Sequence, residues 1–369
     1  MAERPRRRKA KASERKKQPV EEKKTEKPVP RMKPFRPERF EIGNQLGKGS
    51  YGVVHLAHDK QRGDMPLVLK KIKIARPDEG IDGLTERDLQ AEAMAMRLLD
   101  DVCSSRRADR GRAKLSKGIV PCLLDVFQDK DHFYLSMEFL GGDPAGGQWT
   151  TLENHLETLR EGPLSARVTV AENLINAVKI MHAHGVVNRD LKPDNTMINT
   201  DTLDIQLIDL GMACFTEPPA AAAAAPKRKA KGRAKKASSS LPRASKEERS
   251  GGGQPGVCGP TCIGWGTPLY IAPEALEDAK ICYFGKDAAK ATDIFSLGIT
   301  LLELFAESEL PVLIDDMIRR ANVKDEDTLY LSKKELPIDS YIHEEFVLET
   351  LRKMLYKDPQ QRSITSLKR

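Results

Sequence analysis

Apolar residues between positions 40 and 140 recur with two different periods. From Phe40 to Ile74, alternation of apolar and polar positions around a glycine-rich turn predicts three strands. The next stretch, GLTERDLQAEAMAMRLL, places Leu89, Met96 and Leu99 among the apolar positions of a helix. PCLLDVFQDKDHFYLSMEFL then predicts two further strands joined by a short polar turn. Together these elements indicate a small, mostly antiparallel sheet that carries one helix.

After GGDPAGG the pattern becomes helical. Apolar residues recur near helical spacing at Val170, Leu174, Val178 and Met181, and Gly185 is well placed to end that helix. Farther along, ATDIFSLGITLLELF is apolar enough for a buried helix. We therefore expect an α+β fold of two lobes, an N-lobe over residues 41–140 and a mostly helical C-lobe over residues 141–369, with a cleft between them.

Charge divides the chain further. The formal net charge is +7, but residues 1–40 carry +10 and residues 217–250 carry +7, so the rest of the chain is near −10. The composition of residues 1–40 predicts a disordered basic tail, and that of residues 217–256 a disordered basic insertion. Such segments serve as nuclear-localisation or nucleic-acid-binding patches, or are simply solvated, and both interpretations stay open.

We expect an intracellular protein, cytoplasmic or nuclear. No run of about 18 apolar residues predicts a membrane span, and the first residues lack the apolar region of a secretory signal. Six scattered cysteines without such a signal suggest a reducing compartment. Cys258 and Cys262, with Cys214 before the insertion, have the choice of a disulfide, zinc or free thiols. Because no fourth ligand completes a tetrahedral site, free thiols are favoured.

Two features of the N-lobe indicate phosphate binding. GKGSYG, Gly47 to Gly52, fits the pattern G-x-G-x-x-G, but a strand follows it where a dinucleotide-binding fold has a helix. Its backbone amides would lie over phosphates from a strand turn. Lys70 shares the more apolar face of its strand, so its ammonium needs an anionic partner such as Glu92 on the following helix. An exposed edge strand with snorkelling lysines is the alternative.

The stretch VVNRDLKPDNTMI places charge beside apolar, strand-forming residues. Asp190 lies five residues before Asn195, and Asp209 follows a second apolar strand. Carboxylate and amide oxygens are the ligands that Mg²⁺ prefers, and Mg²⁺ leaves positions for phosphate oxygens. Lys192 adds a positive charge for a phosphoryl group. The charge has metal and nucleotide as its expected partners.

In order along the chain, GKGSYG, VLK, NRDLKPDN, DLG, APE, TDIFSLG and DPQQR resemble the motifs of the eukaryotic-type protein serine/threonine kinases. The resemblance covers nearly all of residues 41–365 and implies an enzyme that uses ATP and Mg²⁺ to phosphorylate protein substrates. It makes Asn195 and Asp209 the metal ligands, and Asp190 the base or orienting group for the substrate hydroxyl. Lys192 would neutralise the γ-phosphoryl group.

The same resemblance implies a nucleotide site. Lys70 would contact the α- and β-phosphates while Glu92 holds it in place. Met137 matches the gatekeeper position, and the hinge follows it along the adenine. The implied nucleotide-binding residues are Leu46, Gly47, Lys48, Gly49, Ser50, Tyr51, Gly52, Val54, Val68, Lys70, Glu92, Met137, Glu138, Leu140, Met197 and Asp209.

Matches in the C-lobe imply the substrate class. DLKPDN and GTPLYIAPE have the serine/threonine form, in which Thr267 bridges Asp190 and Lys192 and the loop docks a peptide. Glu274 is expected to pair with Arg362 as a structural strut. Asp194 and Glu303 match positions that contact basic substrate residues in some relatives, so basic residues around the acceptor are expected.

Two features depart from the family. Asn188 replaces the histidine of H-R-D and Leu210 the phenylalanine of D-F-G, both in the apolar spine that joins the lobes through Met96 and Leu123. Asn188 therefore needs buried hydrogen-bond partners. The basic insertion lengthens the activation segment, and Arg189 is typical of control by phosphorylation there. Its candidate acceptors are Ser238 to Ser240, Ser245, Ser250 and Thr261; a flexible insertion without a regulatory role is the alternative.

Three other functions were weighed. A catalytically weak kinase-fold scaffold is disfavoured because Lys70, Asp190, Asn195 and Asp209 are all present. Binding of nucleic acid or partner proteins through the tail and insertion is compatible with catalysis. A small-molecule kinase is disfavoured by the peptide-docking loop. The sequence leaves the oligomeric state undetermined.

Overall fold

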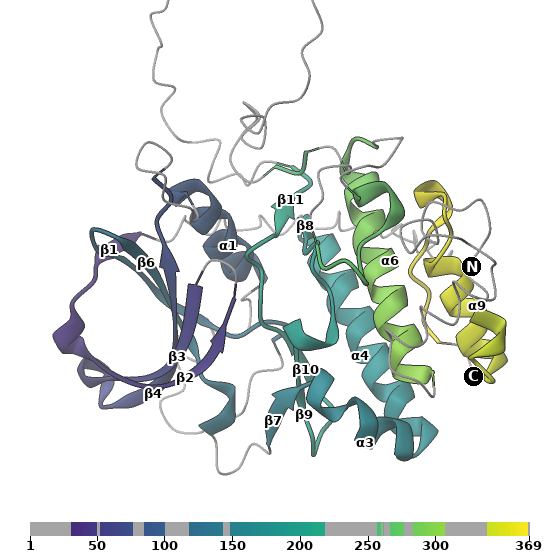
Figure 1. The fold of residues 1–369 in the computed structure, drawn as a ribbon, viewed down its shortest axis with the longest axis horizontal. Helices are drawn as coiled ribbons and strands as arrows, with labels where there is room; N and C mark the ends of the chain where they lie inside the picture. The colour runs from purple at the N-terminus through teal and green to yellow at the C-terminus, as the bar shows by residue number, and fades with distance from the viewer. Residues whose placement is uncertain are drawn as a thin grey trace, which may run out of the picture.

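The computed structural model describes residues 31–49, 52–76, 85–99, 118–142, 148–217, 257–259, 261, 266–276, 283–306 and 338–367. It has two lobes, a curved sheet with one helix and a larger lobe of helices and short strands (Figure 1). The predicted bilobal α+β fold is confirmed. Within the described residues, none of the helices combines the length and apolarity needed to cross a bilayer.

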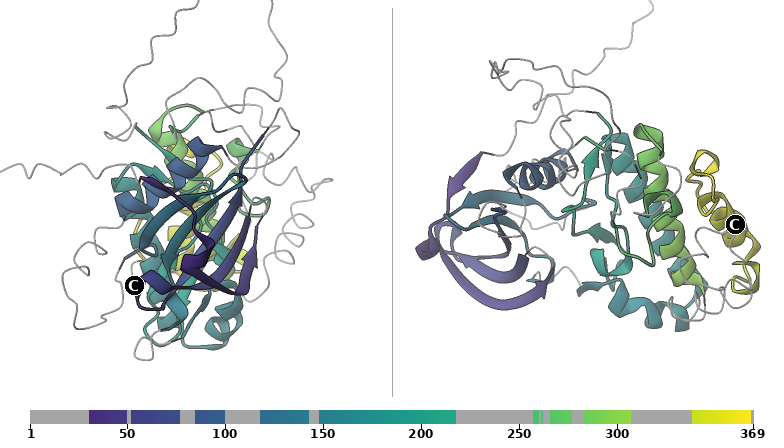
Figure 2. Two further views of the ribbon diagram at one scale, coloured as in Figure 1. Left: turned by 90° about the vertical axis from the view of Figure 1, so that its left-hand side faces the viewer. Right: turned by 45° about the horizontal axis from the view of Figure 1, so that its top comes forward.

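The N-lobe is built on a six-stranded sheet with the order β1-β5-β6-β4-β3-β2. Its β1 pairs with β5 in parallel, and the other neighbours are antiparallel. The helix α1 packs against β5, and Figure 2 shows how the strands curl around the lobe. The elements are β1 (Met32–Pro34), β2 (Phe40–Lys48), β3 (Gly52–Asp59), β4 (Met65–Lys73), α1 (Glu86–Leu99), β5 (Leu123–Gln128) and β6 (His132–Glu138).

The prediction of a disordered tail is wrong for residues 31–40. Phe35 stacks on Tyr134 with ring centroids 3.7 Å apart, and it also stacks on Phe40. With Phe127 they close a second apolar core on the outer face of the sheet. A stretch rich in Lys, Arg and Pro therefore orders because its interspersed aromatic residues have a sheet face to cover.

The basic residues of that segment find carboxylates in the same place. Arg39 donates two hydrogen bonds to the buried Asp59, at 2.8 and 2.5 Å. Lys33 and Arg62 both bind Asp125. Their charges serve the fold, so net charge was a poor guide to where order begins.

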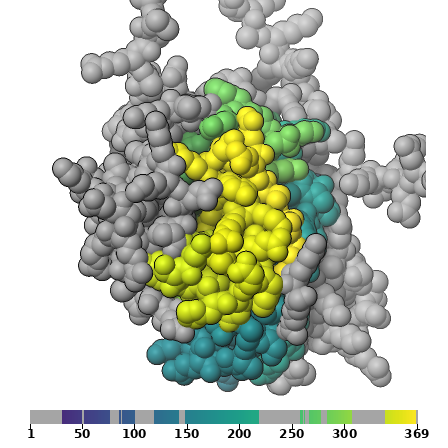
Figure 3. Space-filling view, turned by 90° about the vertical axis from the view of Figure 1, so that its right-hand side faces the viewer, coloured from purple at the N-terminus to yellow at the C-terminus, as the bar shows by residue number. Residues whose placement is uncertain are grey.

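The C-lobe packs around α6, a buried helix predicted from its apolar sequence. The helices α3, α4 and α9 contact it, and the C-terminal residues that include α9 form the face shown in yellow in Figure 3. Gly185 follows α4 with φ of 73°, so the predicted glycine helix end is confirmed. The helices are α3 (Leu156–Glu161), α4 (Leu164–Ala183), α6 (Lys286–Phe305) and α9 (Glu345–Met354).

Short strands between α4 and the activation segment carry the chemical residues. They form a three-stranded sheet, β10-β9-β7, and a two-stranded sheet, β11-β8. Their bounds are β7 (Trp149–Thr151), β8 (Val186–Val187), β9 (Thr196–Asn199), β10 (Ile205–Leu207) and β11 (Cys214–Phe215). The catalytic motifs therefore lie at strand ends, as the opening stretch of charge beside apolar residues predicted.

Candidate active site

The register of the N-lobe sheet aligns the nucleotide-binding candidates in rows. Gly47 lies opposite Val54, Val54 opposite Lys70, and Val68 opposite Met137. Residues directly opposite each other point to the same face, as do residues two apart on one strand. Lys70 therefore shares its face with Val54, Val68 and Met137, the face that packs toward α1.

Gly52 lets β3 approach β4 closely. A Cβ atom at this position would lie 2.3 Å from the carbonyl oxygen of Lys71. The amide of Gly49 donates to the carbonyl of Gly52 at 2.9 Å, which closes the turn. Ser50 and Tyr51, predicted to cover phosphates, lie outside the described residues.

Lys70 makes the predicted ion pair with Glu92. Its Nζ donates to Glu92 Oε1 at 2.7 Å and to Asp209 Oδ1 at 3.0 Å, so one ammonium joins both lobes. Burial alone would lower the pKa of Lys70, but the two carboxylates raise it above its ordinary value. Burial raises the pKa of Glu92, and Lys70 opposes that rise. The carboxylate of Glu92 is 1% exposed and thus depends on Lys70 for its charge.

The catalytic loop and the peptide-docking loop meet at Asp190. Thr267 Oγ1 donates to Asp190 Oδ1 at 2.6 Å and accepts from Lys192 Nζ at 2.6 Å, which confirms the predicted bridge. Asn195 Nδ2 donates to Asp190 Oδ2 at 2.7 Å and to its carbonyl at 3.0 Å. The Asp190 carboxylate is therefore oriented from both sides.

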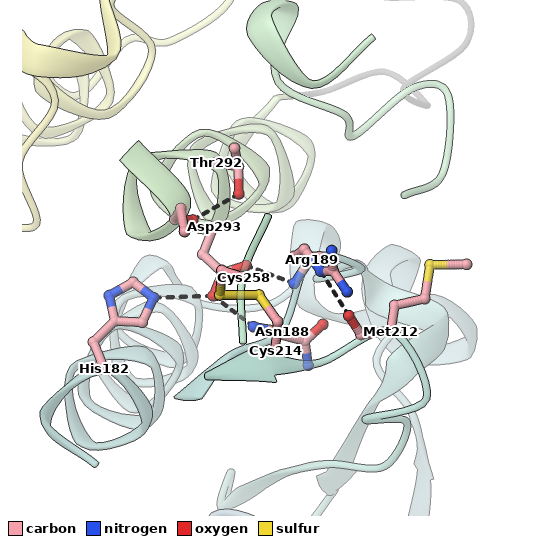
Figure 4. The surroundings of a disulfide bond; sticks show 9 residues. His182, Asn188, Arg189, Met212, Cys214, Cys258, Thr292 and Asp293 are labelled. Carbon is pink, nitrogen blue, oxygen red and sulfur yellow. Dashed lines mark hydrogen bonds and ion pairs between the residues drawn. A yellow bond between two sulfur atoms is a disulfide. The ribbon is translucent and has the colours of Figure 1, made fainter. Parts of the chain in front are cut away.

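Asp293 of α6 holds the backbone of this loop from beneath. It accepts the amide hydrogens of Asn188 and Arg189 at 2.8 and 2.7 Å and bonds to His182 Nε2 at 2.9 Å (Figure 4). This helps to keep Arg189 at φ of 68°, a backbone conformation that is uncommon outside glycine. Burial lowers the pKa of Arg189 to about 10, although Asp293 and Asp88 oppose that shift. His182 was missed by the sequence analysis, because a histidine among apolar helix positions gives no signal of its partner.

Asn188 finds the buried partners that its position requires. It is 1% exposed; its Oδ1 accepts from the amide of Asp190 at 2.8 Å, and its Nδ2 donates to the carbonyl of Asp209 at 3.4 Å. Leu210, Met96 and Leu123 are buried in the same core. The amide thus connects the two segments that bear the catalytic aspartates.

Two oxygens beside the DLG turn fit a hard divalent cation. Asp209 Oδ1 accepts from Lys70 and from the amide of Gly211, while Oδ2 has no partner among the described residues. The same holds for the side-chain oxygen of Asn195, since its nitrogen makes both hydrogen bonds to Asp190. Burial would raise the pKa of Asp209, but Lys70 and Gly211 lower it, which keeps this carboxylate ionised. Carboxylate and amide oxygens suit Mg²⁺.

The other predicted nucleotide contacts are distributed over both lobes. Met137 and Leu140 are buried, Val54, Val68 and Glu138 are partly buried, and Leu46 is 49% exposed at the edge strand. Met197, on β9, is partly buried in the C-lobe. The amide of Glu138 donates to the carbonyl of Cys122, so the hinge begins in a fixed position.

The predicted strut between Glu274 and Arg362 is confirmed. The guanidinium makes two parallel bonds to the carboxylate at 2.6 and 2.8 Å, and both side chains are almost completely buried. Backbone carbonyls of Ala291, Tyr356 and Lys357 accept its other hydrogens. Every donor of this buried cation is therefore used.

The expectation that Glu303 contacts substrate does not fit its place in the structure. Glu303 is 4% exposed, and its Oε2 accepts from the hydroxyl of Tyr270 at 2.7 Å. Burial and this carboxylate raise the pKa of Tyr270 well above its ordinary value, with smaller effects from Glu153 and Asp194. Asp194 and Glu153 are exposed beside the catalytic loop.

The expectation of free thiols is wrong for Cys214 and Cys258, which form a disulfide. Backbone pairing of Val257 and Cys258 with Phe215 brings the two cysteines together, and no sequence pattern announced that pairing. Cys122 is also disulfide-bonded. The prediction of a reducing, cytoplasmic or nuclear location loses the support of free thiols and stays a prediction. Cys262 lies outside the described residues.

Among the candidate phosphorylation sites, the structure describes Thr261. It is 7% exposed and exchanges hydrogen bonds with the backbone of Tyr283 at 3.0 and 3.1 Å. In this conformation Thr261 is a poor acceptor. The serine candidates lie outside the described residues.

Comparison with known proteins agrees with this geometry. The sequence profile of the protein kinase domain matches residues 40–229, just over half of the chain. The chain belongs to the protein kinase family. The family predicted from the motifs is thereby confirmed, and the match includes the glycine-rich loop, the catalytic loop and the DLG turn.

Curated relatives of this kinase domain are serine/threonine kinases by name. Probable serine/threonine-protein kinase ndrC of Dictyostelium discoideum is 32% identical over 47% of this chain and 11% of its own length. Serine/threonine-protein kinase DBF20 of Saccharomyces cerevisiae is 34% identical over 50% of this chain and 28% of its own. CBL-interacting protein kinase 33 of Oryza sativa subsp. japonica is 27% identical over 73% of this chain and 44% of its own. The kinase domain thus spans less than half the length of these relatives.

Proposed function

We propose that this kinase domain transfers the γ-phosphoryl group of ATP to serine or threonine hydroxyls of protein substrates. The observation that carries the proposal is the pair of networks joined at the cleft. Lys70, Glu92 and Asp209 form one, and Asp190, Lys192, Thr267 and Asn195 form the other. Each contains groups that phosphoryl transfer uses for positioning and charge stabilisation.

Each network has a separate task in this proposal. Lys70 binds the α- and β-phosphates, and its buried pair with Glu92 fixes the ammonium. Asp190 orients the acceptor hydroxyl and receives its proton, because Thr267 and Asn195 hold the carboxylate in one orientation. Lys192 stabilises the negative charge on the transferred group.

Asn195 and Asp209 would hold Mg²⁺ through the two oxygens that have no partner among the described residues. When bound, the metal neutralises charge on the phosphate oxygens. The residues of the glycine turn, the hinge and Met197 would enclose the nucleotide. The chain itself keeps Asp209 ionised through Lys70 and the Gly211 amide.

Asp194 and Glu153 support a preference for basic residues near the acceptor. Both carboxylates are exposed, and both act on the Tyr270 hydroxyl from the side of the catalytic loop. Exposed carboxylates attract Arg or Lys of a peptide through charge. Glu303 would act indirectly, since it holds Tyr270.

A scaffold without catalysis is the weaker alternative, because each group needed for transfer is present and connected to its neighbours. Binding of nucleic acid or partner proteins through the basic segments rests on charge alone. Residues 1–30 and 218–256 lie outside the described residues. That function stays a prediction.

The test is a radiolabelled-phosphate assay on an arrayed library of serine and threonine peptides. The wild-type chain is compared with Asp190→Ala and Lys70→Met. Phosphate incorporation that falls in both variants supports the proposal, and enrichment of Arg or Lys near the acceptor supports the basic preference.

A matched control is Asp201→Ala, which removes an exposed carboxylate outside the site. It should retain activity. Incorporation that survives both active-site substitutions would show that another enzyme makes the product, and would sink the proposal.

A further inference from the structure

The disulfide joins the two ends of the activation insertion. Cys214 on β11 bonds to Cys258, 44 residues later, with Cα atoms 5.0 Å apart. The amide of Cys258 donates to the carbonyl of Phe215 at 2.9 Å, and Val257 forms a parallel bridge with Phe215. The chain that returns from the insertion is therefore fastened to β11 by backbone and covalent bonds.

The two sulfurs differ in accessibility. Cys214 is 2% exposed and packs with Val187 and Ala289, whereas Cys258 is partly exposed and Gly259 is exposed. A pocket beside the bond is lined by both cysteines, Arg189, Gly259 and Thr261, among other residues. A small or protein-borne thiol can approach Cys258 from this side.

Arg189 gives the pocket the charge that favours thiol exchange. Its Nε donates to the carbonyl of Met212 at 2.7 Å, which places the guanidinium beside β11 (Figure 4). A neighbouring cation stabilises the thiolate that leaves when a disulfide is attacked, and exchange is faster with a better leaving thiolate. The surroundings thus suit a disulfide that exchanges rather than an inert one.

The strand that bears the bond touches two parts of the proposed active site. β11 pairs with β8, and the residues after β8 are Asn188, Arg189 and Asp190. β11 also contacts α1, which carries Glu92. A change at the disulfide therefore has direct structural routes to the catalytic loop and to the Lys70–Glu92 pair.

We propose that Cys214 and Cys258 form a reversible thiol–disulfide site that regulates the kinase activity, with the oxidised state the more active one. The described structure, in which the catalytic contacts are assembled, contains the bond. Reduction would release the returning chain from β11 and loosen the support of Asn188 and α1. The regulatory part of this inference rests on the proposed function.

The reductant is a dithiol. One of its thiolates attacks Cys258 Sγ, the Cys258–Cys214 bond breaks, and Cys214 leaves as a thiolate beside Arg189. The second thiol of the reductant resolves the mixed disulfide. The dithiol becomes a disulfide, two electrons and two protons pass to the cysteines, and atoms balance.

The experiment equilibrates the full chain in dithiothreitol buffers of graded redox potential. Alkylation and mass spectrometry measure the thiol content of Cys214 and Cys258, circular dichroism reports folding, and hydrogen exchange follows the amides of residues 186–190. Phosphate transfer is measured in parallel. We expect reduction in the folded protein, faster exchange at 186–190 and a reversible activity loss of about 5- to 100-fold, the usual range of coupling between sites.

Two variants separate this disulfide from the others. Cys258→Ser should have the low activity of the reduced chain and no further redox response. Cys122→Ser changes another disulfide-bonded cysteine, at the far side of the N-lobe helix contact with β5, and should keep the response. A response that survives in Cys258→Ser, or vanishes in Cys122→Ser, overturns the assignment.

Three further results would also overturn it: reduction only on global unfolding, unchanged exchange at 186–190 after reduction, or unchanged activity. If neither redox state transfers phosphate, the proposed function fails. Thiol labelling and hydrogen exchange then still decide whether the site is reversible and coupled to the loop.

Discussion

Asn188 stands at a position where relatives place an imidazole, and its amide has both a donor and an acceptor in use. It accepts from the Asp190 amide and donates to the Asp209 carbonyl. A neutral imidazole also offers one donor and one acceptor. The substitution therefore changes the shape of the connection between the two catalytic segments more than its hydrogen-bonding capacity.

This comparison predicts different effects for two substitutions. Asn188→His should keep phosphate transfer within about tenfold of wild type, because its ring can replace at least one of the bonds. Asn188→Ala should lower kcat by about 10- to 100-fold, since it leaves two buried backbone groups without partners. Steady-state kinetics on one peptide measures both.

Asn173→Ala is the matched control, because Asn173 also bonds a backbone carbonyl, that of Leu203, but away from the site. It should lower stability slightly and leave kcat near wild type. Equal kcat losses in Asn173→Ala and Asn188→Ala would refute a positioning role for Asn188.

At the scale of elements, β1 and the turn before β2 complete the N-lobe through Arg39 and Asp59. Asp59 is fully buried, and Arg39 and the amide of Gln61 both donate to it. Burial would raise the pKa of Asp59, but these donors lower it below its ordinary value. The segment is thus fastened by a charged pair beneath stacked aromatic rings.

The lowered pKa of Asp59 gives this contact a pH signature. A carboxyl whose pKa is lower in the folded state adds stability above the ordinary aspartate pKa of about 4, and that stability is lost as the pH falls further. Asp59→Asn should reduce the free energy of unfolding by about 2 kcal/mol at pH 7. Urea unfolding from pH 7 to pH 3 should show the difference shrinking below pH 4.

Asp201→Asn, at an exposed turn, should show no such difference at any pH. A gap between wild type and Asp59→Asn that stays constant down to pH 3 would contradict the assignment of the pH dependence to Asp59.

Sequence patterns predicted the elements whose periodicity is strong and local. The three strands from Phe40, the helix that bears Glu92 and the buried helix α6 were all indicated by their apolar spacing. The β1 segment was not, because its order depends on Tyr134 and Asp125, about 90 residues away. The Cys214–Cys258 bond was missed for the same reason: it depends on where the returning chain pairs.

At the scale of the whole molecule, buried charge pairs join segments that the sequence separates. The site residues were predictable from ordered motifs, since each motif carries its own chemistry. Their partners His182 and Tyr270 were not, because one lies among apolar helix positions and the other acts through a residue expected to face substrate. Motifs identify reactive groups, while tertiary contacts decide which groups are consumed in support.

The pair Glu274–Arg362 should be a large determinant of stability, since it links the end of the activation segment to residues near the C-terminal helix. Arg362→Ala leaves a buried carboxylate without its cation and should lower the free energy of unfolding by about 3–5 kcal/mol. Denaturant unfolding measures it.

The control is Arg352→Ala, which breaks an exposed pair with Asp339 and should cost less than about 1 kcal/mol. Comparable losses in the two arginine variants would mean that the buried strut has no special weight.

The central claim is that Asp190 acts on the acceptor hydroxyl at a nucleotide site built by other residues. Its most direct test compares wild type with Asp190→Asn on the best arrayed peptide, measuring kcat for phosphate transfer and the Kd for ATP. The account predicts a fall in kcat of about a thousandfold with little change in Kd, because the amide cannot accept the proton. Undiminished transfer, or a loss explained entirely by weaker ATP binding, would contradict it.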